Sequence, residues 1–164
     1  MLKNINQKSP PKEKIETLVK LYNEGKLDEV LSQSSQLIKT YPHTAVLHNI
    51  IGGISFQRGQ NDLAIASFKN VISLDSCHAH AYNNLGATLI NMQSFQEAKS
   101  NLEKAIELKS DYAEAYNNLG NIFKELEEYD KSIFHYEKAI ALNPDYYEAM
   151  SNLGEVLRKN NKYE

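Results

Sequence analysis

Primary amides return along this chain at one fixed spacing. The pentapeptide YNNLG occupies residues 82–86 and recurs at residues 116–120, which is 34 residues later. An asparagine side chain offers one acceptor and two donors, so it can pair with a peptide backbone whatever the side chains of that peptide are. The spacing places the amides in two rows, which are Asn84, Asn118 and Asn152 in the first and Asn49, Asn83 and Asn117 in the second. Ile50 interrupts the first row.

The other reactive residue types predict no catalytic site. Carboxylates are plentiful but are typical of solvated helix faces, and we find no glycine-rich phosphate loop and no nucleophile elbow. The run CHAH at residues 77–80 has the residue types of a metal site. Its first and last residues stand 34 positions before Asp111 and Glu114, however, which favours a turn with an altered helix cap. We therefore expect no enzymatic activity, no cofactor and no metal site.

The composition is that of a soluble globular protein of 164 residues. The formal net charge is −3, and Lys and Arg are interspersed with Asp and Glu, so nothing resembles the basic patch that binds nucleic acid. No apolar run reaches the length of a bilayer span, and the first residues lack a secretory apolar region. With Cys77 as the single cysteine, we expect a cytoplasmic protein with no nucleic-acid and no membrane partner.

The elements that must position the amides follow the same period. Within residues 79–112, apolar residues fall at helical spacing on both sides of a break at Gln93-Ser94, which predicts two helices joined by a tight turn. The chain as a whole should contain about nine helices after a flexible polar tail. The expected segments are the tail 1–10, four units at 11–44, 45–78, 79–112 and 113–146, and an incomplete unit at 147–164.

Helix starts are also marked chemically. Three pairs have the spacing of a capping box, in which two side chains bond the free backbone N–H groups at a helix start. These pairs are Ser94 with Glu97, Asp111 with Glu114, and Asp145 with Glu148.

The pattern resembles the tetratricopeptide repeat family, which carries aromatic residues, a Leu-Gly pair, small residues and a proline at fixed positions. The matching residues in unit 113–146 are Tyr116, Leu119, Gly120, Phe123, Tyr129, Tyr136, Ala139 and Pro144. Ser132 replaces the first alanine of the pattern there, and Ser76 and Ser110 replace the proline in two other units. The resemblance implies an all-α, right-handed α-solenoid of stacked helix-turn-helix repeats. Small residues such as Gly86 and Gly120 would let neighbouring helices approach closely.

In this family the first helices line the concave groove of the solenoid, which would place both amide rows there. The rows resemble the asparagine ladder in the repeat arm of O-linked N-acetylglucosamine transferases, where such residues hold extended polypeptide. The alternative is that these asparagines belong to the general repeat pattern and serve helix starts or solvation. The residues expected to bind peptide are Asn49, Asn83, Asn84, Asn117, Asn118, Asn121 and Asn152.

The groove positions change in character along the chain. They are apolar near Val46 and Ile50 and become acidic near Glu114 and Glu125. Relatives that bind the acidic C-termini of chaperones use Lys and Arg at positions that here hold residues such as Gly53, so those cations are missing. An extended ligand with an apolar end and a basic end is therefore expected.

Three functions remain open at this point. The first is a non-catalytic scaffold or adaptor that binds an extended peptide or protein segment in its groove. The second is the substrate-presenting arm of a larger enzyme, because the stretch 15–25 looks like repeat regions fused to bacterial glycosyltransferases or sulfotransferases. The third is a scaffold that self-associates through an uncapped last helix, whose apolar side carries Met150, Leu153 and Leu157.

Overall fold

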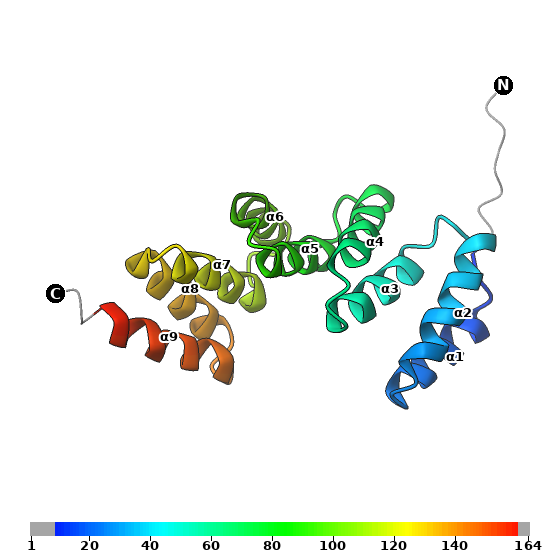
Figure 1. Ribbon diagram of the computed structural model, residues 1–164, viewed down its shortest axis with the longest axis horizontal. Coiled ribbons are helices and arrows are strands. Elements are labelled where there is room, and N and C mark those ends of the chain that lie inside the picture. Colours follow the sequence, from blue (N-terminus) through cyan, green and yellow to red (C-terminus); the bar gives the residue numbers. More distant parts are fainter. Residues whose placement is uncertain (1–8, 161–164) are drawn as a thin grey trace, which may run out of the picture. The chain divides into compact units, whose positions relative to one another are not determined.

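The computed structural model describes residues 9–160, and every regular element within that range is an α-helix. The predicted all-α class is therefore confirmed, whereas most of the predicted tail, residues 1–10, lies outside the described residues. The nine helices of the described part are α1 (Lys12–Asn23), α2 (Leu27–Thr40), α3 (Ala45–Gln57), α4 (Asn61–Leu74), α5 (Ala79–Asn91), α6 (Phe95–Leu108), α7 (Ala113–Glu125), α8 (Tyr129–Leu142) and α9 (Tyr147–Asn160) (Figure 1).

The turns inside the helix pairs repeat with the period of the sequence. Each contains one residue with positive φ, and these residues are 34 positions apart: Gly25, Gly59, Gln93 and Glu127. The turn closes with a bond from the backbone N–H three residues beyond the helix end back to the last turn of the helix, as in Ser94 N–H to the Leu89 carbonyl at 2.9 Å. The predicted break at Gln93-Ser94 is thus a tight turn after α5, in which Gln93 adopts the left-handed backbone conformation.

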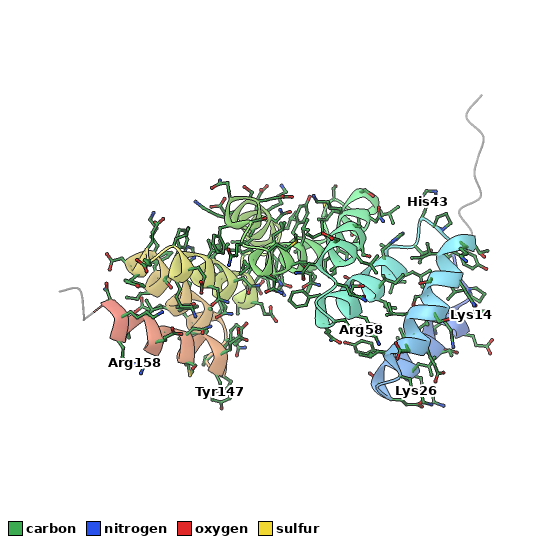
Figure 2. All side chains as sticks on the ribbon, viewed as in Figure 1. Lys14, Lys26, His43, Arg58, Tyr147 and Arg158 are labelled. Carbon is green, nitrogen blue, oxygen red and sulfur yellow. The ribbon has the colours of Figure 1, made fainter. Side chains whose placement is uncertain are left out.

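The helices form two compact units (Figure 1). Unit 1 contains α1 to α4, and unit 2 contains α5 to α9. In unit 1, Leu18, Val30, Leu47 and Ile54 form a fully buried cluster between the first three helices. Arg58, labelled in Figure 2, follows α3 and pairs with Asp28 of α2 at 2.8 Å.

In unit 2, glycine lets the two helices of each pair approach closely. A Cβ atom at Gly120 would lie 2.5 Å from Cε1 of Tyr136, and one at Gly86 would lie 2.7 Å from Cγ of Leu102. The buried Ser132 hydroxyl donates to the Gly120 carbonyl at 2.9 Å. The serine that replaces the alanine of the family pattern therefore bonds across the narrowest part of the α7–α8 contact.

None of the three predicted capping boxes forms as expected. Ser94 precedes α6 but its side chain makes no cap bond, and the residues preceding α7 and α9 are Tyr112 and Tyr146 rather than Asp111 and Asp145. Before α5, Nδ1 of His78 accepts from the Ala81 N–H at 3.1 Å, so histidine serves as the cap in this turn. The sequence spacing missed this because a cap also requires the right backbone angle, and that angle is set by the preceding turn.

One face of α9 is open among the described residues. Tyr147 is 74% exposed, Met150 and Leu157 are also exposed, and a Cβ at Gly154 would meet no atom within 4 Å (Figure 2). The equivalent face of α7 receives α8. Self-association through this helix stays a prediction.

His135 of α8 is held neutral inside an aromatic cluster. Its ring stacks on that of Phe123, with centroids 5.2 Å apart and planes 7° apart, and its Nδ1 is buried without a hydrogen-bond partner. Burial, and to a lesser extent the charge of Lys99, lowers the pKa of His135 from 6.5 to about 4.

We expect this histidine to make unit 2 sensitive to acid. A histidine whose folded-state pKa is lowered contributes stability that is full above pH 6.5 and is lost as the pH falls towards 4. The urea midpoint of the wild type should therefore fall more steeply over this range than that of His135→Phe, which keeps the stack but cannot titrate. Circular dichroism at a series of pH values measures the difference, and parallel curves for the two proteins would contradict it.

Candidate functional site

The amide rows of unit 2 run across the first helices of three successive pairs, α5, α7 and α9. Two of the asparagines that the sequence places along the groove are buried, since Asn83 is 6% exposed and Asn117 is 1% exposed. Asn84, Asn118, Asn121 and Asn152 remain partly exposed beside them. The second row thus lies beneath the first, and the two rows contact each other.

Asn117 links α7 to α9 and fixes the orientation of the Asn152 side chain. Its Nδ2 donates to Oε1 of Glu148 at 3.1 Å. Because a carboxylate oxygen accepts, the Asn117 oxygen must face the other way, where it accepts from Nδ2 of Asn152 at 3.3 Å. The Asn152 nitrogen therefore points inwards.

Asn83 makes the equivalent link between α5 and α7. Its Oδ1 accepts from Nδ2 of Asn118 at 3.0 Å, and its own amide group bonds with the buried Tyr112 hydroxyl. Burial of Tyr112 raises the pKa of its hydroxyl, and the charge of Glu114 adds to the effect. Tyr112 therefore stays neutral and holds the Asn83 side chain in place.

Asn121 connects the amide rows to the core. Its Oδ1 accepts from the Tyr136 hydroxyl at 2.7 Å and from Nδ2 of Asn152 at 3.2 Å. Tyr136 is fully buried, so a core residue of α8 determines where a groove residue of α7 points. Burial raises the pKa of Tyr136, and Glu155, Glu125 and Glu148 raise it further through their charges.

Four amide groups keep a hydrogen-bonding atom that has no partner among the described residues. They are the Nδ2 atoms of Asn84 and Asn121 and the Oδ1 atoms of Asn118 and Asn152. Each side chain therefore has one group engaged within the protein and one group open. A ligand would meet single donors and acceptors at this surface rather than the bidentate pairs that an isolated amide could form.

Asn49 lies in unit 1. Its side chain is partly buried in α3, and its Oδ1 atom has no hydrogen-bond partner in the described part of the chain. In unit 1 the position of the first amide row is held by Glu16 and Ile50, so no continuous row of amides is built there.

A polar hollow of about 350 Å³ adjoins the amides of unit 2. Its walls come from α5, α7 and α9 and from the start of α6. The Lys124 ammonium lies against one wall, where it pairs with Glu155 at 3.2 Å and its side chain is only 16% exposed. The residues lining the hollow are Ile90, Asn91, Gln93, Phe95, Asn121, Lys124, Glu125, Glu148 and Asn152.

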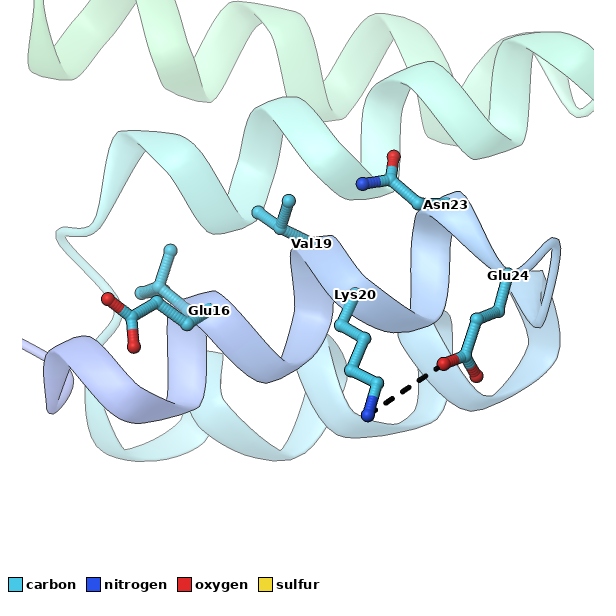
Figure 3. A pocket seen from close by; sticks show the side chains of 6 residues that line it. Glu16, Val19, Lys20, Asn23 and Glu24 are labelled. Carbon is cyan, nitrogen blue, oxygen red and sulfur yellow. Dashed lines mark ion pairs between the residues drawn. The ribbon is translucent and has the colours of Figure 1, made fainter.

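A second hollow, of about 450 Å³, runs along α1 in unit 1. Figure 3 shows Glu16, Val19, Lys20, Asn23 and Glu24 on successive turns of the helix, with Lys20 reaching Glu24 at 4.0 Å. Its surface is mainly apolar and no amide row crosses it. Val46 and Ile50, where the sequence predicts an apolar groove, are not among the residues that line it.

Two tyrosines of the network escaped sequence reasoning. Tyr112 and Tyr146 stand 34 residues apart at the ends of their units, and each bonds with the buried asparagine of the same unit, Asn83 or Asn117. Burial, followed by the charges of Glu148 and Glu114, raises the pKa of Tyr146 to about 12. Their shared spacing was the available signal, because the same offset relates the asparagines that they contact.

The histidines of the CHAH run, His78 and His80, make other contacts in the structure. His78 caps α5, and His80 packs on Tyr112 with ring centroids 5.0 Å apart. Among the described residues, no three side chains of the His, Cys, Asp or Glu type come together as metal ligands would. In the same part of the chain, no helix combines the length and the apolar character needed to cross a bilayer.

Family models and solved structures agree on the type of repeat. Models described as tetratricopeptide repeat match residues 113–146 and 135–164, and one described as TPR repeat matches residues 89–127. Among curated proteins, no significant match is found. Together these matches span residues 89–164, which include α7 and α9 and the last residues of α5.

Solved structures of the same fold cover nearly the whole chain. A crystal structure of MamA protein has 28% identity and a TM-score of 0.78, over 90% of this chain and 81% of that one. MamA from Desulfovibrio magneticus RS-1 has 23% identity and a TM-score of 0.79, over 91% and 85% of the two chains. The first TPR of Spaghetti (RPAP3), bound to the HSP90 peptide SRMEEVD, has 23% identity and a TM-score of 0.67, over 70% and 91%. The predicted α-solenoid class is confirmed by these similarities.

Proposed function

This chain is a tetratricopeptide repeat protein, and from that premise we propose that it is a non-catalytic module which binds an extended peptide or protein segment along the amide rows of unit 2. The observation that carries the proposal is the set of open amide groups on α5, α7 and α9. Both donors and acceptors are present among them. A peptide backbone offers the complementary N–H and C=O groups at every residue.

The open amides are held in fixed orientations, because the second polar group of each side chain is already hydrogen-bonded within the protein. Asn117, Asn83 and Tyr136 fix the side chains from below, so a ligand need not pay the full entropy of ordering them. The fold is also known to hold a peptide in another protein, the first TPR of Spaghetti with SRMEEVD. That ligand is acidic, whereas this chain lacks Lys and Arg at the groove positions where relatives that bind acidic chaperone C-termini carry them.

The proposal is tested with random dodecapeptides displayed on phage and selected against the full chain. Selected peptides are synthesised, and their affinity is measured by fluorescence anisotropy for the wild type and for Asn84→Ala with Asn118→Ala. Two lost hydrogen bonds of about 0.5–1.5 kcal/mol each should weaken binding roughly 5- to 150-fold. Asn101→Ala, on the outer helix α6, is the matched control and should bind as the wild type does.

Thermal unfolding must show that the double variant is folded, because Asn118 also bonds to the buried Asn83. A failure to select any peptide would contradict the proposed function. Equal affinity of the wild type and the folded double variant would show that the amides are not the binding surface.

A further inference from the structure

We infer that the polar hollow of unit 2 receives a basic side chain, lysine or arginine, of the bound segment; this rests on the proposed function and specifies the ligand. The hollow opens directly beside two of the open amides, Asn121 and Asn152, which line it. A segment bound along the amides would therefore project a side chain into it. The chemistry of the walls decides which kind of side chain fits.

The walls provide more negative than positive charge. Glu125 and Glu148 line the hollow together with one cation, Lys124. That cation is committed to the protein, since its Nζ pairs with Glu155 at 3.2 Å and the side chain is nearly covered. Glu155 also pairs with Lys159 at 3.0 Å, whereas Glu125 and Glu148 form no ion pair among the described residues. Lys159 acts on Glu125 only through its charge, and one oxygen of Glu148 accepts from Asn117.

The Tyr136 hydroxyl lies within reach of the same carboxylates. It lies next to the hollow, because it donates to Asn121. After burial, the causes that disfavour its ionisation are the charges of Glu155, Glu125 and Glu148. Of these, Glu125 and Glu148 line the hollow itself, so a cation placed there would be stabilised by their charges.

The neutral walls suit the rest of a basic side chain. Ile90 and Phe95 offer apolar surface for the methylene stem of lysine or arginine, which commonly packs on such groups while its charged end bonds elsewhere. The open Oδ1 of Asn152 and the carboxylates of Glu125 and Glu148 then supply acceptors for its N–H groups. An acidic side chain in the same place would meet like charges.

The test compares matched peptides from the phage selection on the full chain. In each peptide, one arginine at a time is replaced by citrulline, which has the same shape but no charge, or one lysine by norleucine. Replacement at the position that occupies the hollow should weaken binding to the wild type by about tenfold, as expected for a charged hydrogen bond. The same replacement should have little effect on Glu125→Gln with Glu148→Gln.

Glu125→Gln with Glu148→Gln should fold as the wild type does, because the glutamine oxygen at position 148 can still accept from Asn117. Glu103→Gln with Glu137→Gln, on the outer helices α6 and α8, removes the same charge elsewhere and should preserve the tenfold difference. Peptides that bind but contain no required basic residue would overturn this inference and leave the proposed function intact. A required basic residue whose effect survives in Glu125→Gln with Glu148→Gln would place it outside the hollow and would also overturn the inference.

Discussion

Replacing Tyr136 by alanine is expected to lower the free energy of unfolding of unit 2 by about 3–5 kcal/mol, the usual cost of removing a large buried ring. Tyr136 is fully buried, contacts Gly120 across the α7–α8 interface and bonds to Asn121. Its loss leaves a cavity and also releases an amide of the proposed binding surface. Urea unfolding followed by circular dichroism, with hydrogen exchange of the α7 and α8 amides, measures the change.

Two variants separate the parts of this effect. Tyr136→Phe removes only the hydroxyl and should cost about 0.5–1.5 kcal/mol, because Asn121 keeps its bond from Asn152. Phe134→Ala changes a ring that is 53% exposed on the same helix, so it should alter stability by no more than about 0.5 kcal/mol. If Tyr136→Ala were no more destabilising than Phe134→Ala, the assignment of Tyr136 to the centre of this core would be wrong.

The second large effect is expected from adding a single methyl group at Gly120. A Cβ there would lie 2.5 Å from the Tyr136 ring, which cannot move aside because it is buried and its hydroxyl is bonded. Overpacking of this kind costs about 1–3 kcal/mol. It outweighs the gain of up to about 1 kcal/mol that alanine normally brings over glycine inside a helix.

Gly154→Ala is the matched control, since Gly154 occupies the same position of the next repeat. A Cβ at Gly154 meets no atom within 4 Å, so only the helix propensity remains and the variant should be more stable by up to about 1 kcal/mol. The two substitutions should thus shift the urea midpoint in opposite directions. A midpoint of Gly120→Ala at or above that of the wild type would refute the close-packing role of this glycine.

Most of the repeat architecture could be predicted from the sequence. The offset of 34 residues gave the helix pairs and the turns, because apolar and small residues must recur in register when similar hairpins stack on one another. The glycines at 86 and 120 were expected at a close helix contact, and Leu102 and Tyr136 fill that place in the structure. Local periodicity was sufficient here since each helix contacts only near neighbours in the sequence.

The details of the candidate site depended on more distant contacts. The family resemblance placed both amide rows along the groove, but Asn117 is covered by Tyr146 and by α9 of the next repeat. The three predicted capping boxes likewise rested on spacing alone, while the backbone of the preceding turn places His78 and Tyr112 at the helix starts.

By itself the sequence determined the period, the helices and the glycine contacts of this protein, because those follow from residue types at short separations. Only the tertiary structure decided which amides are buried, which atom of each faces outwards and where Lys124 is held. Those properties depend on hydrogen-bond partners about 31 to 35 residues away, such as Glu148 for Asn117 and Asn83 for Asn118. A side chain with both a donor and an acceptor does not reveal from its identity which of the two it will present to a ligand.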